Sequence, residues 1–315
     1  MLKIKFYEAF EEEEELLSRH LPSHICAGYT PQTIQESNDQ DPVSEVVCVR
    51  TQSTIPPEWA KRIKGLLTRS QGFNHLENYK RLYNVLLPCG YLGDYCSVAV
   101  AEHAIMISAI LLKKLKRQLS QFRTFHRDGL TGRQWKDKNA LVIGVGRIGV
   151  QIAGLAKALG MNVKGVDIVK NFNDVRYVSL SEGISWADIV FCAAALTNDT
   201  KKMLTYDLFS QTKRKPVLVN VSRGEIAPLN DMKRLLDEGI LNGLGLDVFE
   251  GEEELACGIR EGKEDSPYIG LSLRDNVVFT PHNAFNTSEA LHEKVEKTID
   301  SIVRFIDTGS FPNKI

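Results

Sequence analysis

The feature that most constrains this chain is a glycine-rich turn, Gly144-Val-Gly146-Arg-Ile-Gly149. Residues 140–143 before it are all apolar, which is typical of a short strand buried on both faces. Apolar residues then recur at helical spacing over 148–159, and a second strand is expected at 162–166, directly before Asp167. This order of strand, turn, helix, strand and acid predicts a doubly wound parallel sheet of the α/β class.

The turn has the residues that a dinucleotide site needs. Gly144 permits a tight turn, Gly146 lets the backbone approach a pyrophosphate, and Gly149 lets the helix pack close to the strand. Free amides at the helix start, in the segment that contains Arg147 and Ile148, would form the anion site. A purely structural turn is the alternative, but the complete order of elements favours a bound dinucleotide.

The acid after the second strand indicates which dinucleotide is bound. Asp167 lies 18 residues beyond Gly149 and would accept hydrogen bonds from the adenosine ribose. Its carboxylate would repel the additional phosphate of NADP. Ile168 and Val169 supply no cation to offset that repulsion, although Lys170 is close. The expected cofactor is therefore NAD.

Length and composition describe an ordinary globular protein. A chain of 315 residues is long enough for two domains, each with its own core, and 43% hydrophobic and 25% charged residues are typical values. The net charge of -1 gives no reason to expect nucleic acid or a membrane surface as a partner. The longest apolar stretch, 104–112, is too short to cross a bilayer, and the first six residues resemble a strand rather than a signal peptide. Six scattered cysteines, with no CxxC pair and no zinc spacing, favour a cytoplasmic protein without a metal site.

The pattern along the chain suggests two α/β segments and a closing helix. Residues 1–99 contain five short apolar runs, and the glutamates at 11–15 are expected to form the solvated start of a helix. One uninterrupted helix is expected from Ser97 to Leu119, and residues 139–280 alternate strands with helices. The expected strands are 2–6, 24–27, 46–49, 66–68 and 85–87, then 140–143, 162–166, 189–192, 217–221, 244–248 and 277–280.

A last helix is expected after a cap at Asn286 or Thr287. It has one apolar stripe, formed by Leu291, Val295, Ile299, Ile302 and Ile306.

Polar residues follow the later strands at their carboxyl ends, where ligands of doubly wound sheets bind. They are Thr197, Arg223, Asp247 and His282, with Glu252 one short loop beyond Asp247. Taken singly, the arginine could be a surface ion pair, the aspartate a helix cap and the histidine a turn residue. Taken together, downstream of a nucleotide loop, they indicate a reaction site.

Three further motifs are Asn220-Val-Ser-Arg-Gly224, Leu246-Asp-Val-Phe-Glu-Gly-Glu252 and Thr280-Pro-His-Asn-Ala-Phe285. With the glycine turn, they resemble the D-isomer-specific 2-hydroxyacid dehydrogenases. The resemblance covers nearly the whole chain, and the motifs occur in the family's order, with 29 residues from the arginine to the glutamate and 30 from there to the histidine. It implies an NAD-dependent oxidoreductase that interconverts a 2-keto acid and a D-2-hydroxy acid.

The resemblance also implies the architecture. A substrate (catalytic) domain of the flavodoxin-like α/β type would consist of residues 1–99 and 287–315. A Rossmann-type NAD-binding domain, residues 100–286, would be inserted into it. The family resemblance alone leads us to expect a homodimer.

By the same resemblance, Arg223 binds the substrate carboxylate, His282 is the acid/base and Glu252 is its carboxylate partner. Asp247 matches the acid near the nicotinamide carboxamide, and Thr197 belongs to the cofactor site. The chemistry agrees, because a guanidinium offers a planar fork of donors to a carboxylate. An imidazole is the natural proton donor near neutral pH, and a neighbouring carboxylate would stabilise its protonated form and orient the ring. The hydride chemistry belongs to the nicotinamide.

The substrate pocket is also expected from the resemblance. Gln71 and Gly72 match the loop whose backbone amides bind the substrate carboxylate. Tyr95 and Phe285 match the D-lactate dehydrogenase branch of the family, and with Phe73 they could form an apolar wall or simply belong to the core.

Two alternatives stay open on the sequence. The same scaffold could act on phosphite, formate or a phosphorylated hydroxyacid, for which Arg50 and Arg69 are candidate cations. The chain could instead be a non-enzymatic NAD-sensing protein like the family's corepressor branch, which has the same triad. The polar stretch 253–274 departs from the family pattern and has no evident place in it.

Overall fold

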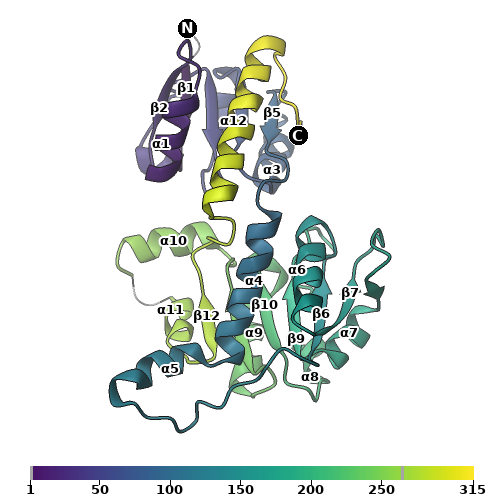
Figure 1. Ribbon diagram of the computed structural model, residues 1–315. Helices are drawn as coiled ribbons and strands as arrows, with labels where there is room; N and C mark the ends of the chain where they lie inside the picture. The colour runs from purple at the N-terminus through teal and green to yellow at the C-terminus, as the bar shows by residue number, and fades with distance from the viewer. Residues whose placement is uncertain (1–2, 264–265) are drawn as a thin grey trace. The chain divides into compact units, whose positions relative to one another are not determined.

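The computed structural model describes residues 3–263 and 266–315, which form the helices and strands of two compact units (Figure 1). The first unit comprises Met1–Cys96 and Asn286–Ile315, and the second comprises Ser97–Phe285. The strand expected from residue 2 onward begins at Lys3, and the expectation for residue 2 itself lies outside the described residues.

The first unit contains a five-stranded parallel sheet with the order β2-β1-β3-β4-β5. Its central strands are buried at every position, as expected for a parallel sheet that is covered on both faces. The strands are β1 (Lys3–Phe6), β2 (Cys26–Tyr29), β3 (Val46–Val49), β4 (Gly65–Thr68) and β5 (Cys89–Tyr91), and the helices are α1 (Glu11–His20), α2 (Ile34–Ser37), η1 (Pro57–Lys61), α3 (Asn74–Tyr83) and α12 (Ser288–Thr308).

The strand expected at 85–87 was wrong. This segment follows the left-handed end of α3 at Asn84, and the amide of Val85 donates to the carbonyl of Lys80, so it completes the helix end. Leu86 is 96% exposed, and the strand begins only at Cys89. A short apolar run without clear alternation does not distinguish a strand from the end of a helix.

The second unit contains a seven-stranded parallel sheet with the order β12-β11-β10-β9-β6-β7-β8. This confirms the doubly wound α/β fold. The strands are β6 (Asn139–Ile143), β7 (Asn162–Val166), β8 (Arg176–Tyr177), β9 (Ile189–Cys192), β10 (Val217–Asn220), β11 (Gly243–Leu246) and β12 (Val277–Phe279). The helices are α4 (Ser97–Leu112), α5 (Leu115–Gln121), η2 (Phe122–Thr124), α6 (Arg147–Ala158), α7 (Leu180–Trp186), α8 (Tyr206–Ser210), η3 (Gly224–Ile226), α9 (Leu229–Asp237), α10 (Glu252–Arg260) and α11 (Pro267–Ser272).

Helices cover both faces of this sheet. Leu244 and Leu246 of β11 belong to a core that also contains Met232 of α9, whereas Gly245 between them faces Ile107 of α4. Since neighbouring strand residues point to opposite faces, α9 and α4 lie on opposite sides of the sheet. Both faces are therefore apolar, and the strands are apolar throughout rather than alternating.

The uninterrupted helix expected from 97 to 119 was also wrong. It breaks at Lys114, whose φ of 54° places it in the left-handed region, and α5 begins at the next residue. The carbonyl of Leu112 accepts a hydrogen bond from the amide of Arg133 at 2.8 Å, and Lys114 Nζ donates to the carbonyl of Gly129 at 2.9 Å. Contacts from a segment far along the chain thus end a helix whose own residues would allow it to continue.

Two helices of the first unit, α1 and α12, have polar residues on their buried faces. Glu13 of α1 is fully buried, so the expectation of a solvated glutamate run fails at this position. The stripe expected on α12 is buried at Leu291, Val295 and Ile302 and only half-buried at Ile299 and Ile306. The buried face of α12 also contains Lys294, Thr298, Ser301 and Phe305.

Among residues 3–263 and 266–315, no helix has the length and apolar character needed to cross a membrane.

Candidate active site

One edge of the seven-stranded sheet gathers the candidate residues of the second unit. The strands are parallel, so the segments that follow them all leave from the same edge. The chain continues from β6 to β7 on one side and returns to β9 on the other, which makes β6 the switch point where ligands of such sheets bind. Across this edge, Asp167 follows β7, the glycine turn follows β6, Thr197 follows β9, Arg223 follows β10, Asp247 follows β11 and His282 follows β12.

The glycine turn has no room for side chains at two of its positions. Gly144 has a φ of +83°, and a Cβ there would lie 2.3 Å from the Cα of Ala194. A Cβ on Gly149 would lie 1.9 Å from the carbonyl oxygen of Gly144, so the helix could not approach the strand as it does. A Cβ on Gly146 would meet no atom within 4 Å. The open side of the turn is therefore at Gly146, the N-cap of α6, as a bound pyrophosphate requires.

Asp167 supports the turn from the next strand. Its Oδ2 accepts a hydrogen bond from the amide of Val145 at 2.7 Å, and its Oδ1 accepts one from the amide of Val169 at 2.9 Å. A carboxylate has about four acceptor sites, so these two bonds leave capacity for ribose hydroxyls. The turn, the helix start and this acid fit a dinucleotide, with Arg147 exposed at the first helical position.

Arg223 is presented by a clamped loop. The side chain of Asn220, the fully buried last residue of β10, donates to the carbonyl of Arg223 at 2.9 Å and accepts from the amide of Ser222 at 3.0 Å. The hydroxyl of Ser222 donates to the carbonyl of Ala194, beside the glycine turn. The half-buried guanidinium donates to the carbonyl of Ser222 at 2.7 Å. The loop is therefore held from both sides, with its cation at the edge of the sheet.

His282 and Glu252 are in direct contact. His282 Nδ1 and Glu252 Oε1 are 2.6 Å apart, and the two side chains are 23% and 20% exposed. This brings together two residues that are 30 positions apart, as the resemblance implied. The histidine has a φ of +50°, a conformation that few residues other than glycine adopt, although histidine adopts it more often than most. A strained backbone of this kind persists only where its surroundings hold it in place.

Asp247 holds the turn that contains the histidine. It is 1% exposed, and its carboxylate accepts hydrogen bonds from the hydroxyl of Thr280 at 2.6 Å and from the amides of Asn283 and Ala284 at 2.9 and 3.0 Å. Nε2 of His103 lies 3.0 Å from the Thr280 hydroxyl, and burial lowers the pKa of His103 despite the opposing effect of Asp247. The observed contacts of Asp247 are thus with the protein. A contact with the nicotinamide carboxamide stays a prediction.

The stretch 253–274 supports the glutamate. Its described residues form α10, which begins at Glu252, and α11, whose Tyr268 packs against Phe249 and Phe279 with ring centroids 5.1 and 5.9 Å away. The Tyr268 hydroxyl accepts from the amide of Glu250 at 3.0 Å and donates to its carbonyl at 3.3 Å. Burial raises the pKa of Tyr268 to about 12, so it is neutral in this role. This part of the chain therefore fixes the backbone two residues before Glu252.

Thr197 lies on an exposed turn after β9. Its amide donates to Thr200 Oγ1 at 2.7 Å, and Thr200 Oγ1 donates to the carbonyl of Ala195 at 2.7 Å. The turn is thus closed by its own side chains. The described contacts of Thr197 are local, and its contact with the cofactor stays a prediction.

The first unit carries the loop that was matched to the substrate's carboxylate. The hydroxyl of Ser70 donates to the carbonyl of Gly72 at 2.7 Å, and the thiol of Cys96 donates to Gln71 Oε1 at 3.6 Å. Phe73 packs on Tyr91 with centroids 4.3 Å apart. Tyr95 is 7% exposed, and burial raises its pKa well above the usual range. Gln71, Gly72 and Tyr95 belong to this unit, whereas Phe285, 8% exposed, belongs to the other.

Sequence reasoning gave no role to several residues that support the site. They are Asn220, Ser222, Thr280 and Tyr268, whose side chains bond to loop backbone or to Asp247. Asn220 had a detectable signal, because an asparagine that ends an apolar strand run has to satisfy its amide locally. Tyr268 had none, since its partner is a backbone group 18 residues away.

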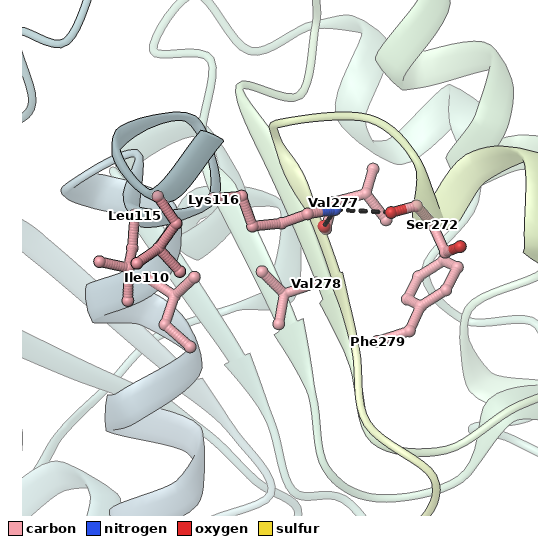
Figure 2. Close-up of a pocket in the computed structure, with 8 residues that line it drawn as sticks. Ile110, Leu115, Lys116, Ser272, Val277, Val278 and Phe279 are labelled. Carbon is pink, nitrogen blue, oxygen red and sulfur yellow. Dashed lines mark hydrogen bonds between the residues drawn. The ribbon is translucent and has the colours of Figure 1, made fainter. Parts of the chain in front are cut away.

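A separate apolar pocket lies along β12. It has a volume of about 230 Å³. Figure 2 shows Lys116 beside it, and Lys116 Nζ donates to the carbonyls of Ser272 at 2.5 Å and Val277 at 2.9 Å. All three residues of β12 line the pocket, together with residues of α4 and α5. The lining residues are Ile110, Leu115, Lys116, Leu119, Ser272, Val277, Val278 and Phe279.

The structure offers no group of three His, Cys, Asp or Glu residues for a metal ion within its described ranges.

Comparison with known proteins agrees with this geometry. Residues 104–284 match the family model described as D-isomer specific 2-hydroxyacid dehydrogenase, NAD binding domain. The D-lactate dehydrogenase of Escherichia coli is 30% identical over 261 residues, which is 80% of this chain and 79% of that protein. The D-lactate dehydrogenase of Streptococcus agalactiae is 27% identical over 332 residues, covering both chains completely.

Solved structures give the same result. The D-lactate dehydrogenase of Aquifex aeolicus, in complex with NAD and lactic acid, has a TM-score of 0.84 at 26% identity and covers 98% of both chains. The apo-structure of the Escherichia coli enzyme has a TM-score of 0.84 at 26% identity and covers both chains completely. The family model matches more than half of the chain, and relatives match its full length. The protein is therefore an NAD-dependent enzyme that belongs to the D-isomer-specific 2-hydroxyacid dehydrogenase family.

Proposed function

We propose that this enzyme reduces a 2-keto acid to the D-2-hydroxy acid, with His282 as the proton donor and Arg223 as the carboxylate anchor. The observation that supports this most directly is the 2.6 Å contact between His282 and Glu252 at the sheet edge that also carries the glycine turn. A proton donor held by a carboxylate beside a dinucleotide site is what carbonyl reduction needs.

Each side chain has one role in the proposal. Arg223 binds the substrate carboxylate with two parallel donors and draws electron density from the neighbouring carbonyl. His282 donates a proton from Nε2 to the carbonyl oxygen, because Nδ1 faces Glu252. Glu252 stabilises the protonated imidazole and fixes the orientation of the ring. NADH, when bound at the glycine turn, supplies the hydride that reduces the carbonyl carbon.

We also propose that the first unit is the substrate (catalytic) domain. Its loop amides at Gln71 and Gly72 would bind the substrate carboxylate, and Tyr95, with Phe285, would shape the pocket for the side chain. In this loop the Ser70 hydroxyl donates to the carbonyl of Gly72, and Gln71 Oε1 accepts from the thiol of Cys96. Neither bond uses the amide of Gln71 or of Gly72, which supports a role for these amides in anion binding. Asp247 and Thr197 complete the cofactor site in this proposal.

The test is a panel of substrates followed by NADH absorbance at 340 nm. Pyruvate, glyoxylate, hydroxypyruvate and longer 2-keto acids are supplied with NADH, and the product is analysed for the D-isomer. Arg223→Ala and His282→Ala should each lower kcat/KM at least about 100-fold while NADH still binds. Arg214→Ala and His126→Ala, which remove the same side chains from exposed positions, are the matched controls.

The same panel separates the alternatives. Activity with phosphite, formate or a phosphorylated hydroxyacid alone would replace the proposed substrate. NADH binding without turnover of any member would favour an NAD-sensing protein. Arg69 gives no support to a phosphorylated substrate, because its guanidinium is fully buried and donates to Glu13 and to backbone carbonyls.

We propose a homodimer that involves the segment after α4. Three large apolar side chains between Leu119 of α5 and Phe125, the residue after η2, are exposed: Leu119 by 66%, Phe122 by 73% and Phe125 by 71%. Exposed apolar side chains this close in the sequence support an interface here, since a large exposed apolar patch typically marks one. We also propose a cytoplasmic location, which the six free cysteines support.

A further inference from the structure

The first unit contains a buried cluster of charges that the proposed reaction does not use. Glu13 of α1, Arg69 at the end of β4 and Lys294 of α12 all have fully buried side chains. Arg69 Nε donates to Glu13 Oε1 at 2.9 Å, and its Nη2 donates to Oε2 at 3.3 Å. Lys294 Nζ lies 2.7 Å from the same Oε1. One carboxylate therefore faces two buried cations.

The second cation is not needed to balance the glutamate. The two-pronged contact with Arg69 already pairs the carboxylate in the strongest geometry available to it. Nη1 of Arg69 donates to the carbonyl of Cys48 at 3.1 Å, and Nη2 also donates to the carbonyls of Tyr7 at 3.0 Å and Glu8 at 3.2 Å. Burying a further charge is costly, and an apolar side chain of similar volume is often at least as stable. Lys294 therefore has an energetic cost that the fold alone does not explain.

The cluster lies next to the amide loop. Arg69 directly precedes Ser70, and its own amide donates to the carbonyl of Val49 at 2.7 Å, which ties the start of the loop to β3. The cluster is at the carboxyl edge of the first unit's sheet, where β1 lies between β2 and β3, the switch point of that sheet. Lys294 and Arg50 both approach the ring of Phe10, at 5.3 and 5.8 Å from its centroid. The buried carboxylate of Glu8 acts on Arg69 as well and accepts from the amide of Arg50 at 2.8 Å. Three cations, Arg50, Arg69 and Lys294, thus lie with two carboxylates, Glu8 and Glu13, where the loop leaves the sheet.

We propose that Lys294 is a positioning residue for substrate binding: with Glu13 it holds the guanidinium of Arg69 in place, and its excess positive charge favours an anion on the amide loop that follows Arg69. The proposal rests on the proposed function, in which this loop binds the carboxylate of a 2-keto acid. Buried charge acts on a nearby anion with little screening by salt, so one lysine can change the affinity considerably.

The proposal has a pH dependence that an exposed lysine would lack. The groups that face Lys294 are Glu13 on α1, Arg69 after β4, Arg50 after β3 and Cys96 after β5. Burial lowers the pKa of Lys294 to about 7, with Glu13 opposing this and the two arginines adding to it. Burial by itself would raise the pKa of Glu13, but Arg69 and Lys294 outweigh it and lower that pKa to about 2. The excess charge is therefore present below about pH 7 and lost above it.

The test measures anion binding directly. Oxalate is titrated into the complex of the full-length enzyme with NADH at pH 6.0 and 8.5, and binding is followed by NADH fluorescence. Lys294→Met removes the charge and keeps the length of the side chain, and Lys294→Gln is the second variant if the first does not fold. Arg304→Met removes one positive charge from the exposed face of the same helix and is the matched control. The same enzymes are assayed for kcat and KM with the best 2-keto acid of the panel.

The expected result is an oxalate Kd about tenfold higher for Lys294→Met than for the wild type at pH 6.0, with the ratio falling toward one at pH 8.5. KM should follow this ratio while kcat and the Kd of NADH change less than about twofold. The control should match the wild type at both pH values. A ratio that is the same at both pH values, or a loss of kcat without a change in Kd, would overturn the proposal. An enzyme that binds oxalate in this way but reduces no 2-keto acid would refute the proposed function and leave the role of Lys294 supported.

Discussion

Replacing Asp247 with asparagine tests whether the histidine turn is held as the structure indicates. The carboxylate is 1% exposed and accepts hydrogen bonds from Thr280, Asn283 and Ala284. Asparagine keeps one acceptor oxygen and puts an NH2 group where the other oxygen was. At least one of the two backbone amides would then face a donor. Because Asp247 is closed to water, that amide would lose the carboxylate oxygen to which it donates.

The magnitude follows from these bonds. A buried donor without a partner costs about 1–3 kcal/mol, and the bonds that remain weaken by about 1 kcal/mol when the acceptor loses its charge. The free energy of unfolding should therefore fall by about 2–4 kcal/mol. For a unit of 150–250 residues this corresponds to a Tm lower by about 4–16 °C. Since the bonded amides directly follow His282, kcat should also fall on the order of tenfold as the imidazole loses its fixed position.

The assay is calorimetry of the apo-enzyme together with steady-state kinetics and NADH binding. Asp207→Asn, which removes the same charge from an exposed position of the same unit, is the control. A Tm within 2 °C and a kcat within twofold of the control would refute this reasoning. A raised Kd for NADH in addition to these changes would show that Asp247 also contacts the cofactor, as the family resemblance implies.

Three further changes have defined outcomes. Asp167→Ala should weaken NAD binding on the order of tenfold and relax the preference over NADP, because both the ribose acceptor and the repulsion of a 2′-phosphate are lost; an unchanged ratio of kcat/KM for NADH and NADPH would contradict it. Phe122→Asp combined with Leu119→Asp should yield a monomer by light scattering with its fold retained, and a dimer of unchanged affinity would exclude this surface. The pKa of Lys294 is about 7 in the folded state, below the 10.5 of the unfolded chain. Burial of its charge therefore lowers the free energy of unfolding fully below pH 7, and this loss disappears as the pH rises from 7 toward 10.5. Lys294→Met should therefore raise Tm most at pH 6, with a gain that shrinks by pH 9, and a gain independent of pH would contradict this.

The fold could be predicted because its signals are local. The run at 139–149 contains a strand, a turn and a helix start in eleven consecutive residues, and the structure gives a steric reason for Gly144 and Gly149. The parallel strands 162–166 and 189–192 were predicted to the residue, since short apolar runs bounded by polar residues have few other structures. The helix break at Lys114 could not be predicted. The bonds that cause it come from Gly129 and Arg133, and no local pattern shows them.

The pairing of His282 with Glu252 was predicted only with the help of the family motifs. Composition and spacing place a histidine and a carboxylate at the ends of strands, but two ends of one sheet edge can be far apart. What brings them together is the turn held by Asp247 and the backbone anchored by Tyr268. The roles of Arg223 and of the amide loop were proposed from the same motifs and await the kinetic tests.

The buried charge cluster shows what pattern analysis misses in principle. A run of glutamates and a lysine on an otherwise amphipathic helix are normally assigned to solvent, because a buried charge is expensive. That assignment fails when charges from three distant segments neutralise one another, as Glu13, Arg69 and Lys294 do in part. Each of these three residues, taken alone, would be predicted to be exposed to solvent. Only the contacts among all three make their burial possible. Lys294 breaks the rule that charged side chains face solvent, and its burial costs stability. Positions that break a local rule in this way are often functional, so a function should be sought there.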